Sequence, residues 1–205
     1  MDAIYEELRT AQLTALQNQI VPHYIVNSLD AIRMKLLLDG QTESAELLGC
    51  LQTSLKTYGF APEERIALAE EFAFLEEYLK FHRFRFLGRL SWVLHLPAEL
   101  QSREIPRFLF QPLVENAIRH GLSPDMPNPQ VEIKAWLQDD FLFLSVSDNG
   151  KGFLESENPY GIGLANVKER LRLLYGDASA VDVKSVPGSG TCVTLRLPEK
   201  GDSYI

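Results

Sequence analysis

The hydrophobic pattern of this chain changes once, near residue 87, from a helical period to a mixture of strand and helix periods. Before that point, apolar residues recur three or four positions apart, which places them on one side of a helix. After it, short stretches with a period of two alternate with helical stretches. This pattern excludes an all-helical or an all-β protein. We expect an α+β fold with two modules, residues 1–86 and 87–200.

The first module is predicted to be helical. Pro22 interrupts an apolar stripe and removes a backbone donor, so we expect one long helix with a kink. Gly40 is placed to end that helix, and a second helix should run to about Thr57. The module is expected to pair with a second copy of the chain in a bundle that buries its apolar seams. The last seam comprises Leu68, Phe72, Leu75, Leu79 and Phe86.

The second module is predicted to be an α/β layer structure. Asp139 and Asp140 form a polar turn between two strand patterns, and the last two strand patterns suggest a hairpin. Gly121 and Gly176 follow the two helical patterns, as expected for residues beyond a helix end. The expected strands are 89–96, 131–138, 141–148, 179–186 and 191–198, and the expected helices are 105–122 and 163–176.

Charge and composition exclude several classes of protein. A formal net charge of −8 argues against nucleic-acid binding, which usually requires a basic excess, but it allows an anionic nucleotide held by local groups. Cys50 and Cys192 lack metal-ligand or disulfide-framework spacing and are expected to be reduced. No run of about eighteen apolar residues could span a bilayer, and the first residues do not resemble a signal peptide. Because the chain opens within a helical pattern, we expect the cytoplasmic portion of a longer protein.

Polar residues interrupt the apolar helix expected at 105–122. Asn116 and His120 are four positions apart and share a face, with Glu115 and Arg119 beside them. An Asn inside an apolar helix is unfavourable unless it has a partner, although a partly exposed polar stripe is the simpler explanation. Alternatively, the Asn116 amide offers Mg²⁺ the oxygen ligand that it prefers, and Arg119 faces phosphate oxygens.

A second motif, "VSDNGKGF", follows a buried strand with an acid and two glycines. Asp148 could accept a hydrogen bond from an amino group on a base, and Gly150 and Gly152 allow close approach of the backbone to a ligand. Asp-Asn-Gly is also a common hairpin turn. Farther on, Gly161 and Gly163 precede a helix, where free N–H groups favour phosphate. The order of these motifs, with a final Gly-Ser-Gly-Thr before the last strand, favours the functional interpretation.

These motifs resemble those of the GHKL (Bergerat) ATP-binding fold, an α/β sandwich with a mixed sheet packed on helices. The similar segments are "LVENAIRHG", "DNGKGF", "GIGLANV" and "GSGTCVTL". In the first module, "QNQIVPHYIVNSLDAI" is similar to the phosphoacceptor region of LytS-like sensor histidine kinases, and "LAEEFAFLEEYLKFHRFRF" also matches that family. The resemblance covers nearly the whole chain.

The resemblance implies a role for each motif. His23 would be the phosphoacceptor, with Asn27 one turn away to orient its ring. Asp148 would bind the adenine amino group, and Asn116 would ligate Mg²⁺. Glu115 is a candidate base. The remaining residues of the implied ATP site are Arg119, His120, Gly150, Gly152, Gly161, Ile162, Gly163, Leu164 and Thr191.

The chain departs from the wider pattern at two positions. Many histidine kinases carry an acid directly after the acceptor, where this chain has Tyr24. Related ATPases commonly carry a Glu four residues before the Mg²⁺-binding Asn, where this chain has Pro112. The second departure favours phosphoryl transfer to protein over steady hydrolysis. The short segment between Phe153 and Tyr160 predicts an abbreviated lid over ATP.

The resemblance therefore implies a sensor histidine kinase of a two-component system. It would phosphorylate His23 from ATP with Mg²⁺ and then transfer the phosphoryl group to an aspartate of a response-regulator receiver domain. The chain would form a homodimer through its N-terminal helices and reach a membrane only through a sensor region absent from it. The alternatives are a GHKL clamp or ATPase without histidine phosphorylation, and a catalytically silent dimerisation scaffold.

Overall fold

The structure is a computed structural model, and it describes residues 25, 27–42, 44–46, 48, 49, 52, 65–154 and 162–199. The chain divides into two compact units, Met1–Pro62 and Glu63–Ile205, which are described one at a time. None of the helices in the described ranges has the length and hydropathy needed to cross a bilayer.

The first unit contains a helix over 27–38 that ends as the sequence predicts. Gly40 has a φ of +74°, and its N–H donates to the carbonyl of Leu37 at 3.1 Å, which confirms it as the residue that stops the helix. The kink at Pro22 and the helix end at Thr57 lie outside the described residues. Several apolar side chains in this helix and just before it are exposed: Ile25, Ile32, Met34, Leu37 and Leu38.

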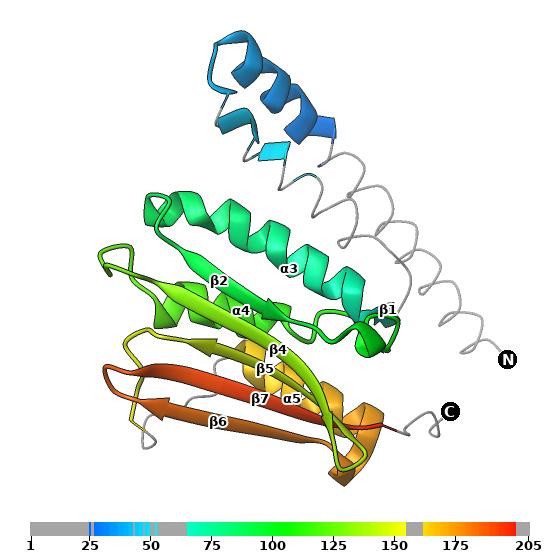
Figure 1. Ribbon diagram of the computed structural model, residues 1–205. Coiled ribbons are helices and arrows are strands. Elements are labelled where there is room, and N and C mark those ends of the chain that lie inside the picture. Colours follow the sequence, from blue (N-terminus) through cyan, green and yellow to red (C-terminus); the bar gives the residue numbers. More distant parts are fainter. Residues whose placement is uncertain are drawn as a thin grey trace, which may run out of the picture. The chain divides into compact units, whose positions relative to one another are not determined.

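The second unit is built on a five-stranded mixed sheet with strand order β2-β4-β5-β7-β6. The pair β2–β4 is parallel, and the other neighbours are antiparallel. Helices α3, α4 (Gln111–Asn116) and α5 lie on one face of this sheet (Figure 1). The strands are β2 (Ser91–His95), β4 (Gln130–Gln138), β5 (Phe141–Asp148), β6 (Ala180–Val186) and β7 (Gly190–Pro198), and the longer helices are α3 (Leu68–Arg83) and α5 (Ile162–Tyr175).

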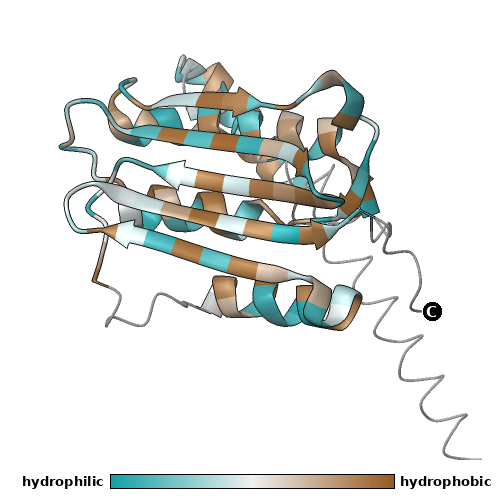
Figure 2. Ribbon diagram, turned by 60° about the horizontal axis from the view of Figure 1, so that its bottom comes forward, coloured by the Kyte–Doolittle hydropathy of each residue, from teal (hydrophilic) through white to brown (hydrophobic). Residues whose placement is uncertain are grey.

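The alternation of apolar and polar residues explains why these segments form strands. Successive side chains of a strand point to opposite faces, so one apolar set of each central strand, β4, β5 and β7, is buried, and Figure 2 shows the alternation along the strands. Asp139 and Asp140 both have positive φ, 50° and 62°, as required in the tight turn that joins β4 to β5. The predicted strands, turn and final hairpin are confirmed. The buried strand residues include Val131, Ile133, Leu142, Leu144, Val146, Leu195 and Leu197.

The helix predicted over 105–122 is shorter than expected. Glu104–Pro106 forms strand β3, which pairs with β1 (Arg65–Ala67) in a separate two-stranded sheet. Helix α4 begins only at Gln111, because Pro112 is acceptable only in a first helical turn. It ends at Asn116. The chain then continues as a π-helical turn, Ala117–Gly121, in which Leu122 N–H donates to the Ala117 carbonyl at 2.8 Å.

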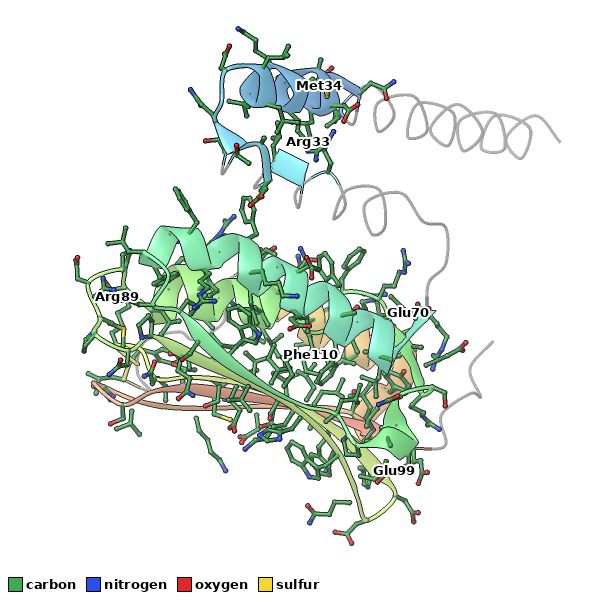
Figure 3. All side chains as sticks on the ribbon, turned by 45° about the horizontal axis from the view of Figure 1, so that its top comes forward. Arg33, Met34, Glu70, Arg89, Glu99 and Phe110 are labelled. Carbon is green, nitrogen blue, oxygen red and sulfur yellow. The ribbon has the colours of Figure 1, made fainter. Side chains whose placement is uncertain are left out.

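The apolar seam of α3 is buried within the second unit. Its members are between 0% and 4% exposed, and Phe72 packs edge-on against Phe110 with ring centroids 5.3 Å apart. Figure 3 shows Phe110 among the packed side chains between α3 and the sheet. The expectation that a second copy covers this seam is therefore wrong, because the seam is already satisfied by its own chain. The division of function between residues 1–86 and 87–200 stays a prediction.

Candidate functional site

A cavity of about 780 Å³ lies beside the C-terminal end of β5. This volume is typical of small-molecule sites. Residues from α4 and its π-helical turn, the loop after β5, the start of α5 and strands β6 and β7 line it. The lining residues are Leu113, Asn116, Ala117, Arg119, His120, Gly121, Val146, Asp148, Lys151, Gly152, Phe153, Gly163, Leu164, Val183, Thr191 and Val193.

The cavity brings together most of the site residues predicted from widely separated motifs. The predicted residues that line it are Asn116, Arg119, His120, Asp148, Gly152, Gly163, Leu164 and Thr191.

Other predicted residues lie elsewhere. Gly150 and Glu115 are not part of the cavity wall, and Asn27 belongs to the first unit. Ile162 is the first residue of α5. His23 and Gly161 lie outside the described residues.

Asp148 is the one acid among the described residues that line the cavity. It ends β5 with only 8% of its surface exposed, and Gly150 N–H donates to its Oδ1 at 2.8 Å. Burial raises the pKa of this carboxyl group from 3.8 to about 6, while the backbone amides of Gly150 and Thr191 limit the rise. The carboxylate is thus held in place by backbone donors in an environment of low polarity, where a hydrogen bond to a ligand is strong.

Gly121 and Gly150 allow parts of the protein itself to approach one another closely around Asp148. A Cβ atom on Gly121 would lie 2.6 Å from Asp148 Oδ1, and one on Gly150 would lie 2.1 Å from the Gly121 carbonyl oxygen. From the sequence, the Gly150 position is expected to lie against the nucleotide. Its contact with Gly121 instead joins the loop after β5 to the end of the π-helical turn.

The same loop is also tied to the β6–β7 hairpin. Lys151 N–H donates to the Gly121 carbonyl at 2.9 Å, and the Lys151 carbonyl accepts from Gly188 N–H at 2.7 Å. Ser185 Oγ accepts from Phe153 N–H at 2.9 Å and lies 2.9 Å from Thr191 Oγ1. These bonds place the predicted Thr191 beside the carboxylate, where it pairs in register with Asp148.

We predict that Gly190→Ala strongly destabilises the fold. Gly190 has a φ of +100°, and a Cβ atom there would lie 1.9 Å from the Asp148 carbonyl oxygen. Backbone must shift to relieve this clash, so we expect a loss of more than about 3 kcal/mol in urea unfolding. Gly188→Ala is the matched control, since Gly188 has a φ of +77° in the same hairpin but open space around it. The control should lose about 1–2 kcal/mol, and equal losses would contradict the prediction.

Asn116 and its neighbours occupy the junction of α4 and the π-helical turn. π-Helical turns are rare and occur frequently at functional sites. Asn116 is half-buried in the cavity wall, while Arg119 and His120 are exposed there. Among the residues that line the cavity, the Asn116 side chain carries an amide oxygen, the kind of ligand that Mg²⁺ prefers.

Glu115 is half-buried on α4 and does not line the cavity. Its Oε1 accepts from Gln111 Nε2 at 2.9 Å. Tyr78 of α3 has a pKa raised to about 12, mainly by burial and next by the charge of Glu115. The Glu115 carboxylate is thus bonded within its own helix and does not line the cavity.

Several cavity residues escaped the sequence analysis. Lys151 is exposed and adds a second cation to the wall besides Arg119. Its position between the two glycines of the Asp148 motif was the available signal. The apolar residues of the wall carried no such signal, because their patterns are those of ordinary buried strands and helices: Leu113, Val146, Phe153, Val183 and Val193.

Two family models together match most of the chain. Residues 11–90 match the family described as "Histidine kinase", and residues 102–201 match "Histidine kinase-, DNA gyrase B-, and HSP90-like ATPase". The chain is 32% identical over 196 residues to the sensor histidine kinase BtsS of Escherichia coli strain K12, covering 96% of this chain and 35% of that protein. It is 28% identical over 205 residues to the sensor protein LytS of a Staphylococcus epidermidis strain, covering 94% of this chain and 34% of that protein. This chain belongs to the LytS-like sensor histidine kinases.

This LytS-like chain spans about a third of the length of BtsS and LytS. Solved structures show the same fold. The histidine kinase domain of the blue-light activated kinase from Erythrobacter litoralis EL346 matches with a TM-score of 0.53 at 20% identity, covering 90% of this chain and 94% of that one. Histidine kinase AdeS of Acinetobacter baumannii matches with a TM-score of 0.54 at 16% identity, covering 87% and 95%. The predicted family and the predicted GHKL fold are thus confirmed.

Proposed function

We propose that this LytS-like chain binds ATP in the cavity and transfers its γ-phosphoryl group to His23. One observation carries the proposal: a buried acid, a half-buried amide and the start of a helix, from three separate motifs, line a single cavity. In the reaction, a neutral imidazole nitrogen of His23 attacks the γ-phosphorus, the bond to the β-phosphate oxygen breaks, and ADP leaves.

Recognition of adenine is assigned to Asp148. Its carboxylate can accept a hydrogen bond from the exocyclic amino group of the base, and apolar neighbours such as Val146 and Val193 suit the flat ring. The backbone donors that hold the carboxylate also prevent it from turning away. This assignment makes ionised Asp148 the form that binds.

The phosphate groups are assigned to the cationic part of the wall. Arg119, His120 and Lys151 provide positive or hydrogen-bonding groups, and α5 begins at the cavity with Gly163 and Leu164. Asn116 would hold Mg²⁺ together with phosphate oxygens. The ion would neutralise charge that develops on the transferred group.

The phosphoacceptor half of the proposal rests on the family resemblance. Asn27 is assigned to orient the His23 ring, and Glu115 is the candidate base, although its bond to Gln111 gives it another structural role.

The exposed apolar side chains of the helix over 27–38 support a homodimer through the N-terminal helices. A response-regulator receiver domain would then take the phosphoryl group, and a sensor region outside this chain would supply any membrane anchor.

Incubation of the chain with γ-labelled ATP and Mg²⁺ tests the proposal. A phosphohistidine is labile in acid and stable in base, so the kinase predicts protein-bound label with those properties. Phosphate release without protein label would instead support a GHKL ATPase. Nucleotide binding with neither label nor release would support a clamp, and no nucleotide binding at all would support a scaffold.

We predict that Asn116→Ala removes the Mg²⁺ dependence of nucleotide binding. The amide oxygen is the proposed protein ligand, so the gain in ATP affinity on adding Mg²⁺ should fall at least about tenfold. Titration calorimetry with and without Mg²⁺ measures this gain. Asn166→Ala is the control, since Asn166 is exposed on α5 and does not line the cavity. An unchanged Mg²⁺ effect in the Asn116 variant would exclude the assigned role.

A further inference from the structure

Glu71 is a completely buried acid that the proposed mechanism does not use. It lies on α3 with 0% of its surface exposed, among residues of the apolar seam. Neither carboxylate oxygen reaches a donor with ordinary hydrogen-bond geometry among the residues that the structure describes. An apolar residue would occupy such a place at a lower free-energy cost, so the charge requires an explanation.

Four neighbouring groups favour the charged form of Glu71 and partly offset the effect of burial. The backbone amides of Phe108 and Phe110 and the guanidinium groups of Arg107 and Arg170 all lower the pKa of Glu71. Burial has the larger effect and raises that pKa to about 7. The two amides lie close enough to lower this pKa, although neither makes a hydrogen bond of ordinary geometry with the carboxylate.

These groups belong to the segments that start α4 and stabilise α5. Phe108 has a φ of +58°, a conformation that side chains rarely adopt and that needs support from its surroundings. Phe110 is the N-cap of α4, and its carbonyl accepts from the N–H groups of Leu113 and Val114. The N-cap has no side-chain hydrogen bond, and its backbone amide favours the negative charge of Glu71.

Arg170 connects the same carboxylate to α5. Its Nη1 donates to the Arg107 carbonyl, while its positive charge favours ionised Glu71. The two helices also meet near the cavity, where a Cβ atom on Gly163 would lie 3.5 Å from Pro112 Cβ. Asn116 and Leu164, one from each helix, both line the cavity.

We propose that Glu71 is a positioning residue of the nucleotide site. Its negative charge holds the Arg107–Phe110 turn and Arg170, and so fixes α4 relative to α5 and the residues of both helices that line the cavity. Glu71 does not line the cavity itself, so it acts only through these segments. The inference rests on the proposed nucleotide binding, and its test has one arm that needs no nucleotide.

The first arm compares the full chain with Glu71→Gln, which keeps the shape of the side chain but removes its charge. Mg²⁺–ADP affinity is measured by calorimetry between pH 6 and pH 8.5. At pH 8 the variant should bind about three- to tenfold more weakly. Near pH 6 wild-type Glu71 is mostly protonated, so the two affinities should converge. Asp148 titrates in this range in both proteins and cancels from the ratio.

The matched control is Glu70→Gln. Glu70 is the exposed neighbour on α3, and Figure 3 shows it at the surface of that helix. Its variant should keep wild-type affinity at every pH. A Glu71→Gln ratio of one throughout would overturn the proposal, and so would a constant loss at all pH values, which would indicate a packing defect rather than a missing charge.

The second arm measures amide hydrogen exchange of residues 107–122 without nucleotide, with variant and wild type at the same pH. At pH 8 the Glu71→Gln variant should exchange faster in this segment, and Glu70→Gln should not. Unchanged exchange would overturn the positioning role. If wild type fails to bind nucleotide while the exchange difference is present, the proposed function fails and the positioning role of Glu71 stands.

Discussion

Replacing Asp148 by Asn is expected to weaken ATP binding by about 10- to 100-fold and to remove most of the preference for ATP over GTP. A hydrogen bond to a charged group contributes about 1.5–3 kcal/mol, and the variant loses that charge. Adenine presents an amino donor where guanine presents a carbonyl acceptor. A carboxylate therefore favours adenine, whereas an amide can donate to guanine. Competition of ATP and GTP for a fluorescent nucleotide measures both effects.

The pH dependence of this binding follows from the raised pKa of Asp148. Because the ionised form accepts the hydrogen bond, wild-type affinity should fall as the pH drops below about 6, and the Asn variant should lack this decrease. Folding stability responds in the opposite direction. The folded pKa lies above the unfolded value, so ionisation costs stability as the pH rises through about 6. The variant should thus melt no lower than wild type at pH 8.

Asp140→Asn is the control for this pair of measurements. Asp140 lies in the β4–β5 turn with a φ of +62°, which Asn also tolerates, and it is outside the cavity. Its variant should bind like wild type. If Asp148→Asn kept both its affinity and its preference for ATP, the base would have to be recognised elsewhere in the cavity.

Replacing His23 by Gln is expected to abolish the acid-labile protein label while leaving ATP affinity within about twofold of wild type. Only a group with an available lone pair can take the phosphoryl group, and the Gln amide has no comparable nucleophile. His23 belongs to the sequence motif of the first unit, whereas the residues assigned to ATP belong to the second. Parallel phosphorylation and binding assays separate the two functions.

His95→Gln serves as the control for the acceptor assignment. His95 is exposed at the end of β2, with Nε2 3.5 Å from Glu132 Oε1, and has no part in the proposed chemistry. Its variant should be labelled like wild type. A persistent label in the His23 variant would place the acceptor on another residue, while the ATP site would be unaffected by that result.

The strands and the long helices could be predicted from the sequence because their patterns are local. The period of two from Val131 to Val146 places the apolar side chains on one face of the sheet in any arrangement of the strands. Asp139 and Asp140 marked the turn because both tolerate positive φ. Asp148 and Asn116 stood out as polar residues next to apolar runs.

The true start of α4 depended on contacts that no local pattern reveals. The apolar run from Ile105 suited a helix, yet its first residues pair with β1, and the left-handed conformation of Phe108 separates strand from helix. Pro112 was a local signal for a first helical turn. The support for that turn comes from Glu71, about forty residues earlier in the chain and on a helix that looked like a dimer seam.

The sequence by itself determined the family, the succession of strands and helices, and which polar residues merited attention, because periodicity and turn chemistry act over a few neighbouring residues. The tertiary structure alone decided that the separated motifs line one cavity, that Gly150 contacts Gly121 and that Glu115 is bonded to Gln111. It also raised the pKa values of Asp148 and Glu71, since desolvation depends on what the rest of the fold packs around a carboxylate.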